Sequence, residues 1–268
     1  MTNRELSRQD CAVTVLGGPT AVIDIGGLRL VSDPTFDEPG PHGYLTKTAG
    51  PAVDENALGS VDVVLVSHDQ HPDNLDERGR AFAVAAPLVL AGPLSATRLG
   101  ERAVGLAPWT SHPVPRPDGR GDLTVLAVPA VHGPEDGERD ADGNVNCEVT
   151  GFVLSGQGLP TLYISGDNAS IRTVAEVSRR VPDIGAALLH AGAARVPAKF
   201  DGRPLSMDSR RAAAAAAVLD ADVVVPAHYD GWTHFSEGRA DLELAFHEAG
   251  LSSLLRSAPH GSWVALRP

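Results

Sequence analysis

Two histidines and three aspartates stand close together in the run SHDQHPDNLD, residues 67–76. His68, His71 and Asp73 belong to this run, which follows directly after the apolar segment 63–66. Imidazole and carboxylate groups are costly to remove from water at the end of a buried strand. A divalent cation that takes them as ligands offsets that cost, and three or four such groups form a zinc-type site. The run therefore predicts a metal centre.

Three more metal-capable side chains follow apolar segments later in the chain. His132, Asp167 and His228 come after the segments VPAV, YISG and VPA. The carboxyl ends of strands meet at one edge of an α/β sheet, which is where such folds gather their sites. We therefore expect these three side chains to converge on the first run.

The elements that must position these residues are short strands followed by helices. Periodicity and turn signals predict helices over 170–180, 207–219 and 240–248, the second of them capped by Ser206. Neither an internal repeat nor a linker interrupts the pattern, so we expect residues 1–268 to form a single domain. The predicted strands cover residues 12–16, 20–25, 28–32, 61–66, 88–90, 123–128, 149–154, 161–164, 186–189, 223–225 and 264–266.

Composition narrows the class of protein. The chain has 268 residues, 43% hydrophobic and 21% charged, as in an ordinary soluble globular protein. Its net charge of -12 speaks against nucleic-acid binding. No apolar run is long enough for a membrane span, and residues 1–10 lack a secretory signal, so we expect a cytoplasmic protein. Cys11 and Cys147 are not in a CxxC spacing, and we expect two reduced thiols without a special role.

The ordered set of motifs resembles a known family. Ser-His-x-x-His-x-Asp-Asn-Leu-Asp, Pro-Ala-Val-His, Ser-Gly-Asp and Pro-Ala-His, spread over the whole chain, resemble the metallo-β-lactamase fold, and within it the ascorbate phosphate lactonase-like hydrolases of bacteria. The resemblance implies an α/β (α+β) fold, a four-layer αββα sandwich with one or two divalent ions. Zinc is the usual ion, with manganese or iron as alternatives, and a homodimer is plausible. In that fold an aspartate bridges the two ions, and here it would be Asp167.

The resemblance also implies the other ligands, residue by residue. The first ion would be held by the imidazoles of His71 and His132, with His68 as the third. The second ion would be held by the carboxylate of Asp73 and the imidazole of His228.

Two departures from the family pattern leave alternatives open. The family reads His-x-His-x-Asp-His, whereas this chain has one extra residue between His68 and His71. Counting back from Asp73 puts Asp69 in the place of the first histidine, so either His68 or Asp69 could be the ligand. Asn74 stands where a histidine binds the second ion. An amide oxygen is a weaker zinc ligand than imidazole, so the second site would be weak, hold a harder ion, or stay empty.

Four residues outside the main motifs bear on catalysis and substrate. His190 ends the predicted strand 186–189 and could reach substrate or metal, and His234 could contact substrate. Together with Asp73, which would orient the attacking water, these two histidines are the candidate catalytic residues. Arg195 and Lys199 supply positive charge that would suit an anionic small-molecule substrate.

These observations predict a metal-dependent hydrolase. A metal-activated water would attack a lactone, another ester or amide, or a phosphodiester, in that order of preference. One alternative keeps a single ion and serves a biosynthetic rearrangement, elimination or oxygen-dependent step. Another is a binding protein without catalysis on the same scaffold.

Overall fold

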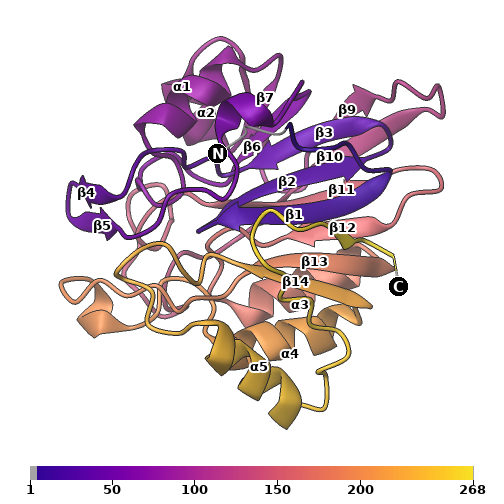
Figure 1. Ribbon diagram of the computed structural model, residues 1–268. Helices are drawn as coiled ribbons and strands as arrows, with labels where there is room; N and C mark the ends of the chain where they lie inside the picture. The colour runs from indigo at the N-terminus through magenta and orange to yellow at the C-terminus, as the bar shows by residue number, and fades with distance from the viewer. Residues whose placement is uncertain (1–4, 268) are drawn as a thin grey trace.

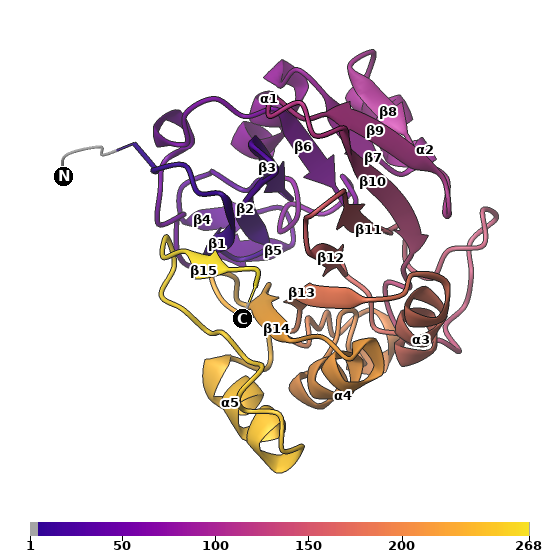
Figure 2. The same cartoon turned by 90° about the vertical axis from the view of Figure 1, so that its right-hand side faces the viewer.

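Two β-sheets pack face to face in the centre of the protein, and helices cover the outer face of each sheet (Figures 1 and 2). The computed structural model describes residues 5–267. Helices α1 and α2 lie on one side, and α3, α4 and α5 lie on the other. The layers therefore follow the order helix, sheet, sheet, helix, which confirms the predicted αββα sandwich.

Each sheet combines antiparallel hairpins with parallel strands. In the first sheet the order is β15-β1-β2-β3-β6-β7-β8, and in the second it is β14-β13-β12-β11-β10-β9. The first sheet consists of β1 (Cys11–Gly17), β2 (Thr20–Ile25), β3 (Leu28–Ser32), β6 (Val63–Val66), β7 (Val89–Ala91), β8 (Ala103–Gly105) and β15 (Val264–Ala265). The second consists of β9 (Ser111–Pro115), β10 (Asp122–Pro129), β11 (Thr150–Ser155), β12 (Thr161–Ile164), β13 (Ile184–His190) and β14 (Val223–Ala227). A separate hairpin pairs β4 (Gly40–His42) with β5 (Leu45–Lys47).

Aliphatic side chains hold the layers together. Residues such as Ile23, Leu65 and Leu154 fill the space between the two sheets, and burying each contributes about 1.5–3 kcal/mol. On the outside of the second sheet, Val174 and Val177 of α3 pack in the same cluster as the alanines of α4. The helices are α1 (Glu77–Ala85), α2 (Pro93–Leu99), α3 (Ile171–Arg180), α4 (Ser209–Leu219) and α5 (Arg239–Glu248), with single 3-10 turns η1 (Glu55–Ala57) and η2 (Phe200–Gly202). Within residues 5–267, no helix is both long enough and apolar enough to cross a membrane.

The three helices predicted from periodicity are present, with one difference at a cap. Asp208, not Ser206, caps α4, because its carboxylate accepts the backbone N–H of Arg211 at 2.8 Å. The Ser206 hydroxyl instead accepts the N–H of Ala194 at 3.1 Å. The helices α1 and α2, the strands β4, β5, β8 and β9, and the turns η1 and η2 were not predicted.

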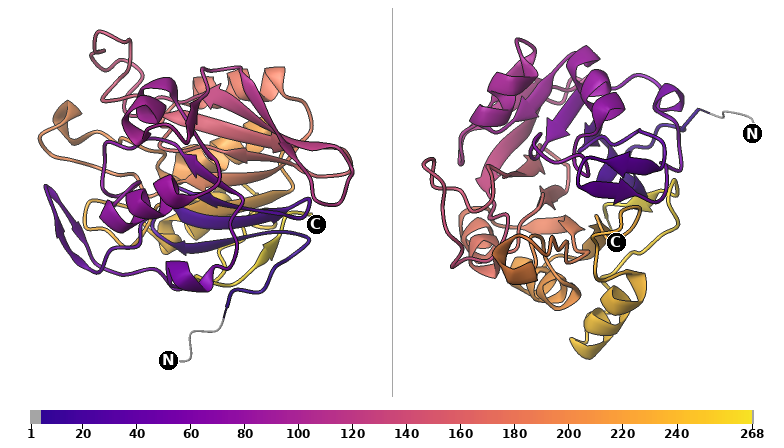
Figure 3. Two further views of the ribbon diagram at one scale, coloured as in Figure 1. Left: turned by 90° about the horizontal axis from the view of Figure 1, so that it is seen from above. Right: turned by 90° about the vertical axis from the view of Figure 1, so that its left-hand side faces the viewer.

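Strand direction brings the motif-bearing loops to one edge. Strand β10 is antiparallel to β11, and β11 is antiparallel to β12, which runs parallel to β13 and β14. Strands β10, β12, β13 and β14 therefore all end at the same edge of the second sheet. The β4–β5 hairpin and the loop that carries η2 extend on one side of the sandwich (Figures 1 and 3).

Candidate metal centre

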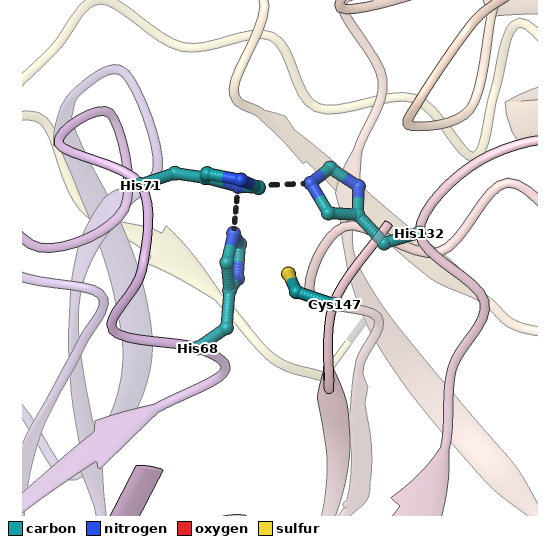
Figure 4. A group of neighbouring side chains, drawn as sticks. All are labelled: His68, His71, His132 and Cys147. Atoms are coloured by element: carbon teal, nitrogen blue, oxygen red, sulfur yellow. Dashed lines mark hydrogen bonds between the residues drawn. The ribbon is translucent and has the colours of Figure 1, made fainter. Parts of the chain in front are cut away.

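The first cluster of side chains gathers three imidazoles and a thiol. His68 and His71 lie in the loop after β6, His132 follows β10, and Cys147 precedes β11. His71 Nδ1 lies 2.9 Å from His68 Nε2 and 3.0 Å from His132 Nε2. One ligand atom from each of the four residues falls within 4.8 Å of the others. Figure 4 shows the three rings directed toward one another with the Cys147 sulfur beside them.

Hydrogen bonds behind the rings set which nitrogens face the centre of this cluster. The Nδ1–H of His132 donates to the Leu205 carbonyl at 2.8 Å, which leaves the Nε2 lone pair directed inward. His68 Nδ1 lies 3.1 Å from the Ser67 hydroxyl, so its Nε2 also faces inward. The lone pairs of His68 Nε2 and His132 Nε2 both face His71 Nδ1, and one proton on that nitrogen cannot form a good hydrogen bond to both. A cation that accepts all three lone pairs can satisfy them.

Burial keeps the three imidazoles in the protonation state that a metal requires. Burial lowers the pKa of His68 and of His132, and it lowers the pKa of His71 to about 3, with the neighbouring His132 adding to the effect. These imidazoles are therefore neutral at pH 7, the form that binds metal. Burial raises the pKa of the Cys147 thiol, so it would lose its proton on binding an ion.

A second cluster forms around one carboxylate oxygen. Asp73 Oδ2 lies 3.1 Å from His228 Nε2 and 2.9 Å from His234 Nε2. Burial alone would raise the pKa of Asp73, but the two imidazoles outweigh it and hold the pKa well below its usual value. Asp73 is thus an anion between two imidazoles, which is a suitable set of donors for a divalent ion.

Asp167 lies between the two clusters. Its Oδ1 accepts the Nδ1–H of His190 at 2.9 Å and lies 3.4 Å from His228 Nδ1. Its Oδ2 lies 3.8 Å from His132 Nδ1. The His190 ring is fully buried and stacks on the His228 ring with a centroid separation of 4.9 Å. Asp167 thus approaches a ring of each cluster, but at the Nδ1 atoms and not at the Nε2 atoms that face the cluster centres. Its role as a carboxylate shared by two ions stays a prediction.

The structure separates the two alternatives at the start of the first motif. His68 points into the first cluster, whereas Asp69 points the other way and pairs with two arginines. Arg98 Nε and Nη2 lie 2.9 and 2.5 Å from Asp69 Oδ1, and Arg80 Nη2 lies 3.0 Å from Oδ2. Burial would raise the pKa of Asp69, but the hydrogen bonds from Arg98 and Arg80 hold it below its usual value. Asp69 is therefore taken out of the candidate ligand set.

Buried atoms without partners support the fit of these clusters to metal ions. Native proteins rarely leave such atoms unpaired, and here several of them carry or face charge. Among residues 5–267, the buried side-chain atoms without a hydrogen-bond partner include Asn74 Oδ1, Asp167 Oδ2, His190 Nε2, His228 Nδ1 and His234 Nδ1. Neutral imidazoles, carboxylates and a thiol are the ligand types that zinc prefers, and the oxygen-rich part also suits manganese or iron.

Sequence reasoning missed Cys147 and placed His234 with the substrate alone. Strand β11 is antiparallel to β10, so β11 and the residues just before it begin at the edge of the sheet where β10 ends. That topology brings Cys147 next to His132, and the signal could have been found once the hairpin was predicted. His234 comes six residues after His228, with no spacing rule to indicate that its ring turns back toward Asp73.

Two cavities border the clusters and meet at an exposed tyrosine. One, of about 470 Å³, is lined by His234 and Phe235 as well as Tyr44. The other, of about 340 Å³, is lined by His71 and again Tyr44. Tyr44 is 57% exposed, and its ring centroid lies 6.5 Å from that of His71. Lys199 Nζ lies 5.8 Å from the Tyr44 ring centroid and donates to Asn146 Oδ1 at 2.6 Å.

Comparisons with known proteins identify the family of this chain. The family described as "Beta-lactamase superfamily domain" matches residues 29–229. A UPF0173 metal-dependent hydrolase from Methanosphaerula palustris is 33% identical over 178 residues, which cover 64% of this chain and 69% of the relative.

Two solved structures share the fold. Isothiocyanate hydrolase from Delia radicum gut bacteria superposes with a TM-score of 0.78 at 20% identity, covering 96% of this chain and 100% of its own. CmlA, a diiron β-hydroxylase from Streptomyces venezuelae, superposes with a TM-score of 0.67 at 13% identity, covering 97% of this chain and 55% of its own. Because the family match spans most of the sequence and the curated relative is a metal-dependent hydrolase, the chain belongs to the beta-lactamase superfamily of metal-dependent hydrolases.

Proposed function

We propose that the protein hydrolyses a small-molecule lactone, another ester or amide, or a phosphodiester with a metal-activated water. The observation that carries the proposal is the convergence of His68, His71, His132 and Cys147 beside a second cluster built on Asp73. A divalent ion bound in such a site lowers the pKa of its water toward ~7 and polarises the scissile bond. The preference for a lactone follows the sequence resemblance to the ascorbate phosphate lactonase-like branch.

The residues of the second cluster are suited to handle the proton of the attacking water. Asp73 is an anion held by two imidazoles, so it can accept a hydrogen bond from a water and orient it. His234 lies between Asp73 and the cavity of about 470 Å³. His190 donates to Asp167 and is fully buried, so in this proposal it positions that carboxylate and does not touch the substrate.

Positive charge near the first cluster favours an anionic substrate. The Lys199 ammonium pairs with the neutral side-chain amide of Asn146, and it lies close enough to contribute to the lowered pKa of His71. A substrate with a carboxylate or phosphate group would give Lys199 a charged partner at the mouth of the site. In the same proposal the protein is cytoplasmic, can form a homodimer, and does not bind nucleic acid or membranes.

Elemental analysis of the purified protein, followed by a substrate panel, tests the proposal. We expect bound zinc, manganese or iron, and hydrolysis that a chelator abolishes and the metal restores. Replacing His132 with alanine should remove metal and activity together. A protein purified without chelator that holds no metal, or a His132→Ala variant with full metal occupancy, would contradict the proposal.

A second candidate function has one observation in its favour. Asp73, His228 and His234 supply two imidazoles and one carboxylate, the donor set of many non-haem iron enzymes that use oxygen. Iron in the purified protein, together with oxygen consumption that depends on a small-molecule substrate, would support this chemistry. Zinc with hydrolysis and no oxygen consumption would rule it out.

A further inference from the structure

The second cluster lacks an imidazole that the family pattern would place at residue 74. Asn74 is fully buried, and its Nδ2 lies 3.5 Å from both Asp33 Oδ2 and Asp167 Oδ1. In this orientation the amide nitrogen, which donates hydrogen bonds and does not bind metal, faces the carboxylates. The amide oxygen, Asn74 Oδ1, has no hydrogen-bond partner among the described residues, but an amide oxygen is a weaker zinc ligand than the imidazole that the family pattern has at this position.

His234 brings an imidazole to the same cluster from a distant part of the chain. Its Nε2 and the Nε2 of His228 lie 2.9 and 3.1 Å from the same oxygen, Asp73 Oδ2. One ligand atom from each of the three residues falls within 4.8 Å of the other two. The side chain of His234 is only 8% exposed, and its Nδ1 has no partner within the described chain. A buried imidazole aimed at an anionic carboxylate and a second imidazole has the surroundings of a ligand.

Backbone contacts on both sides fix the position of this histidine. The N–H of Thr233 donates to the carbonyl of Thr46 at 3.0 Å, and the carbonyl of His234 accepts the N–H of Arg195 at 2.9 Å. The loop after β14 is thus tied to the β4–β5 hairpin and to the segment after β13. These contacts hold the backbone of His234 at a place from which its ring reaches Asp73.

We propose that His234 is a ligand of the second metal ion and takes the place of the histidine that is absent at position 74. This inference rests on the proposed metal-dependent function and adds which residues hold the second ion. One carboxylate and two imidazoles leave coordination positions open for water and substrate, as in catalytic zinc sites. Because His234 also lines the cavity of about 470 Å³, this cluster borders the space that can hold a substrate.

Zinc binding to the metal-free protein tests the inference without relying on activity. Calorimetric titration and elemental analysis would compare wild type with His234→Ala and with His234→Gln, which keeps a side chain of similar length. Replacing a residue that merely orients a ligand already weakens metal affinity about 10–100-fold. We therefore expect both variants to bind the second equivalent at least about 10-fold more weakly while retaining the first. The matched control is His247→Ala, on the exposed side of α5.

A compensating substitution makes the test specific to position 74. Adding Asn74→His to His234→Ala should restore part of the second-site affinity, since the imidazole returns from the family position. Two equivalents bound with unchanged affinity in both His234 variants would overturn the inference and leave the proposed function standing. The inference would also be overturned, with the proposed function still standing, if wild type binds a single ion that is lost in His132→Ala and retained in the His234 variants. A wild type that binds no ion would overturn the proposed function itself.

Discussion

Asp69 and His68 are neighbours in the sequence, but His68 faces the metal-ligand cluster and Asp69 forms ion pairs with two arginines. Asp69→Ala removes a buried carboxylate that accepts hydrogen bonds from Arg98 and Arg80. Breaking a fully buried ion pair costs about 3–5 kcal/mol. Here both arginine side chains are 38% exposed and can return to water, so we expect a loss of about 2–3 kcal/mol. For a protein of this size that lowers the melting temperature by about 4–12 °C.

The assay measures stability and metal content side by side. Thermal unfolding of the metal-free proteins at pH 7 should show the loss in Asp69→Ala, while its metal content equals that of wild type. His68→Ala should instead lose metal from the first cluster. The pKa of Asp69 is lower in the folded protein than its usual value, so its contribution is present above about pH 4. It is lost as the pH falls through the folded pKa, and the two proteins should then converge in stability.

Two outcomes would refute this reasoning. Equal metal loss in Asp69→Ala and His68→Ala would mean that the carboxylate also takes part in the metal site. Normal stability of Asp69→Ala at pH 7, with its metal lost, would mean that Asp69 is the ligand and the arginine pairs contribute nothing.

Three further predictions follow from other parts of the site. Cobalt-substituted wild type should show a thiolate-to-cobalt charge-transfer band in its near-ultraviolet spectrum, and Cys147→Ser should abolish that band. A band that persists in the variant would exclude the thiol as a ligand. Lys199→Met should raise the KM for anionic esters about 10-fold, which corresponds to a loss of ~1.4 kcal/mol in binding free energy, with little change for neutral esters. Lys199→Arg should keep the preference for anionic esters. Equal effects on both ester classes would refute a charge-recognition role. In Gly192→Ala the new Cβ would lie 2.2 Å from the His228 carbonyl oxygen. We therefore expect the free energy of unfolding to fall by about 1–3 kcal/mol and zinc to bind more weakly at the second site. Wild-type values for both measurements would show that the backbone of His228 can move freely.

The layered fold and the edge at which the site forms could be predicted from the sequence. Strands that are buried on both faces appear as short apolar runs, and β6, with the sequence VVLV, is entirely buried. The residues after such runs must lie at strand ends, and the direction of the strands brings His132, Asp167 and His228 to one edge. Helices α1 and α2 lack so clear a pattern. In α1 a glycine interrupts the helical sequence pattern, and Gly79 is required because a Cβ there would lie 1.8 Å from the Pro34 carbonyl oxygen.

The individual ligands were harder to predict because they depend on the course of the loops. Adjacent residues after a strand point in different directions, and spacing alone cannot say which of two neighbours turns inward. In the structure His68 turns toward the other imidazoles, and Asp69 turns toward the arginines of α1 and α2. Cys147 reaches the first cluster through the pairing of β10 with β11, which the predicted strands could have indicated. His234 reaches the second cluster only through contacts between segments far apart in the sequence, which local patterns do not reveal.

The two clusters differ in donor set, and that difference suggests separate tasks for the two ions. The first brings together His68, His71, His132 and a thiol, and four protein ligands around zinc make a closed site. The second offers a carboxylate and two imidazoles beside a cavity, and three ligands leave room for water. We therefore expect an ion in the first cluster to stabilise the loops that carry the ligands, and the reacting bond to approach the second. Under this arrangement Cys147→Ser should affect stability more than turnover, and His234→Gln should do the opposite.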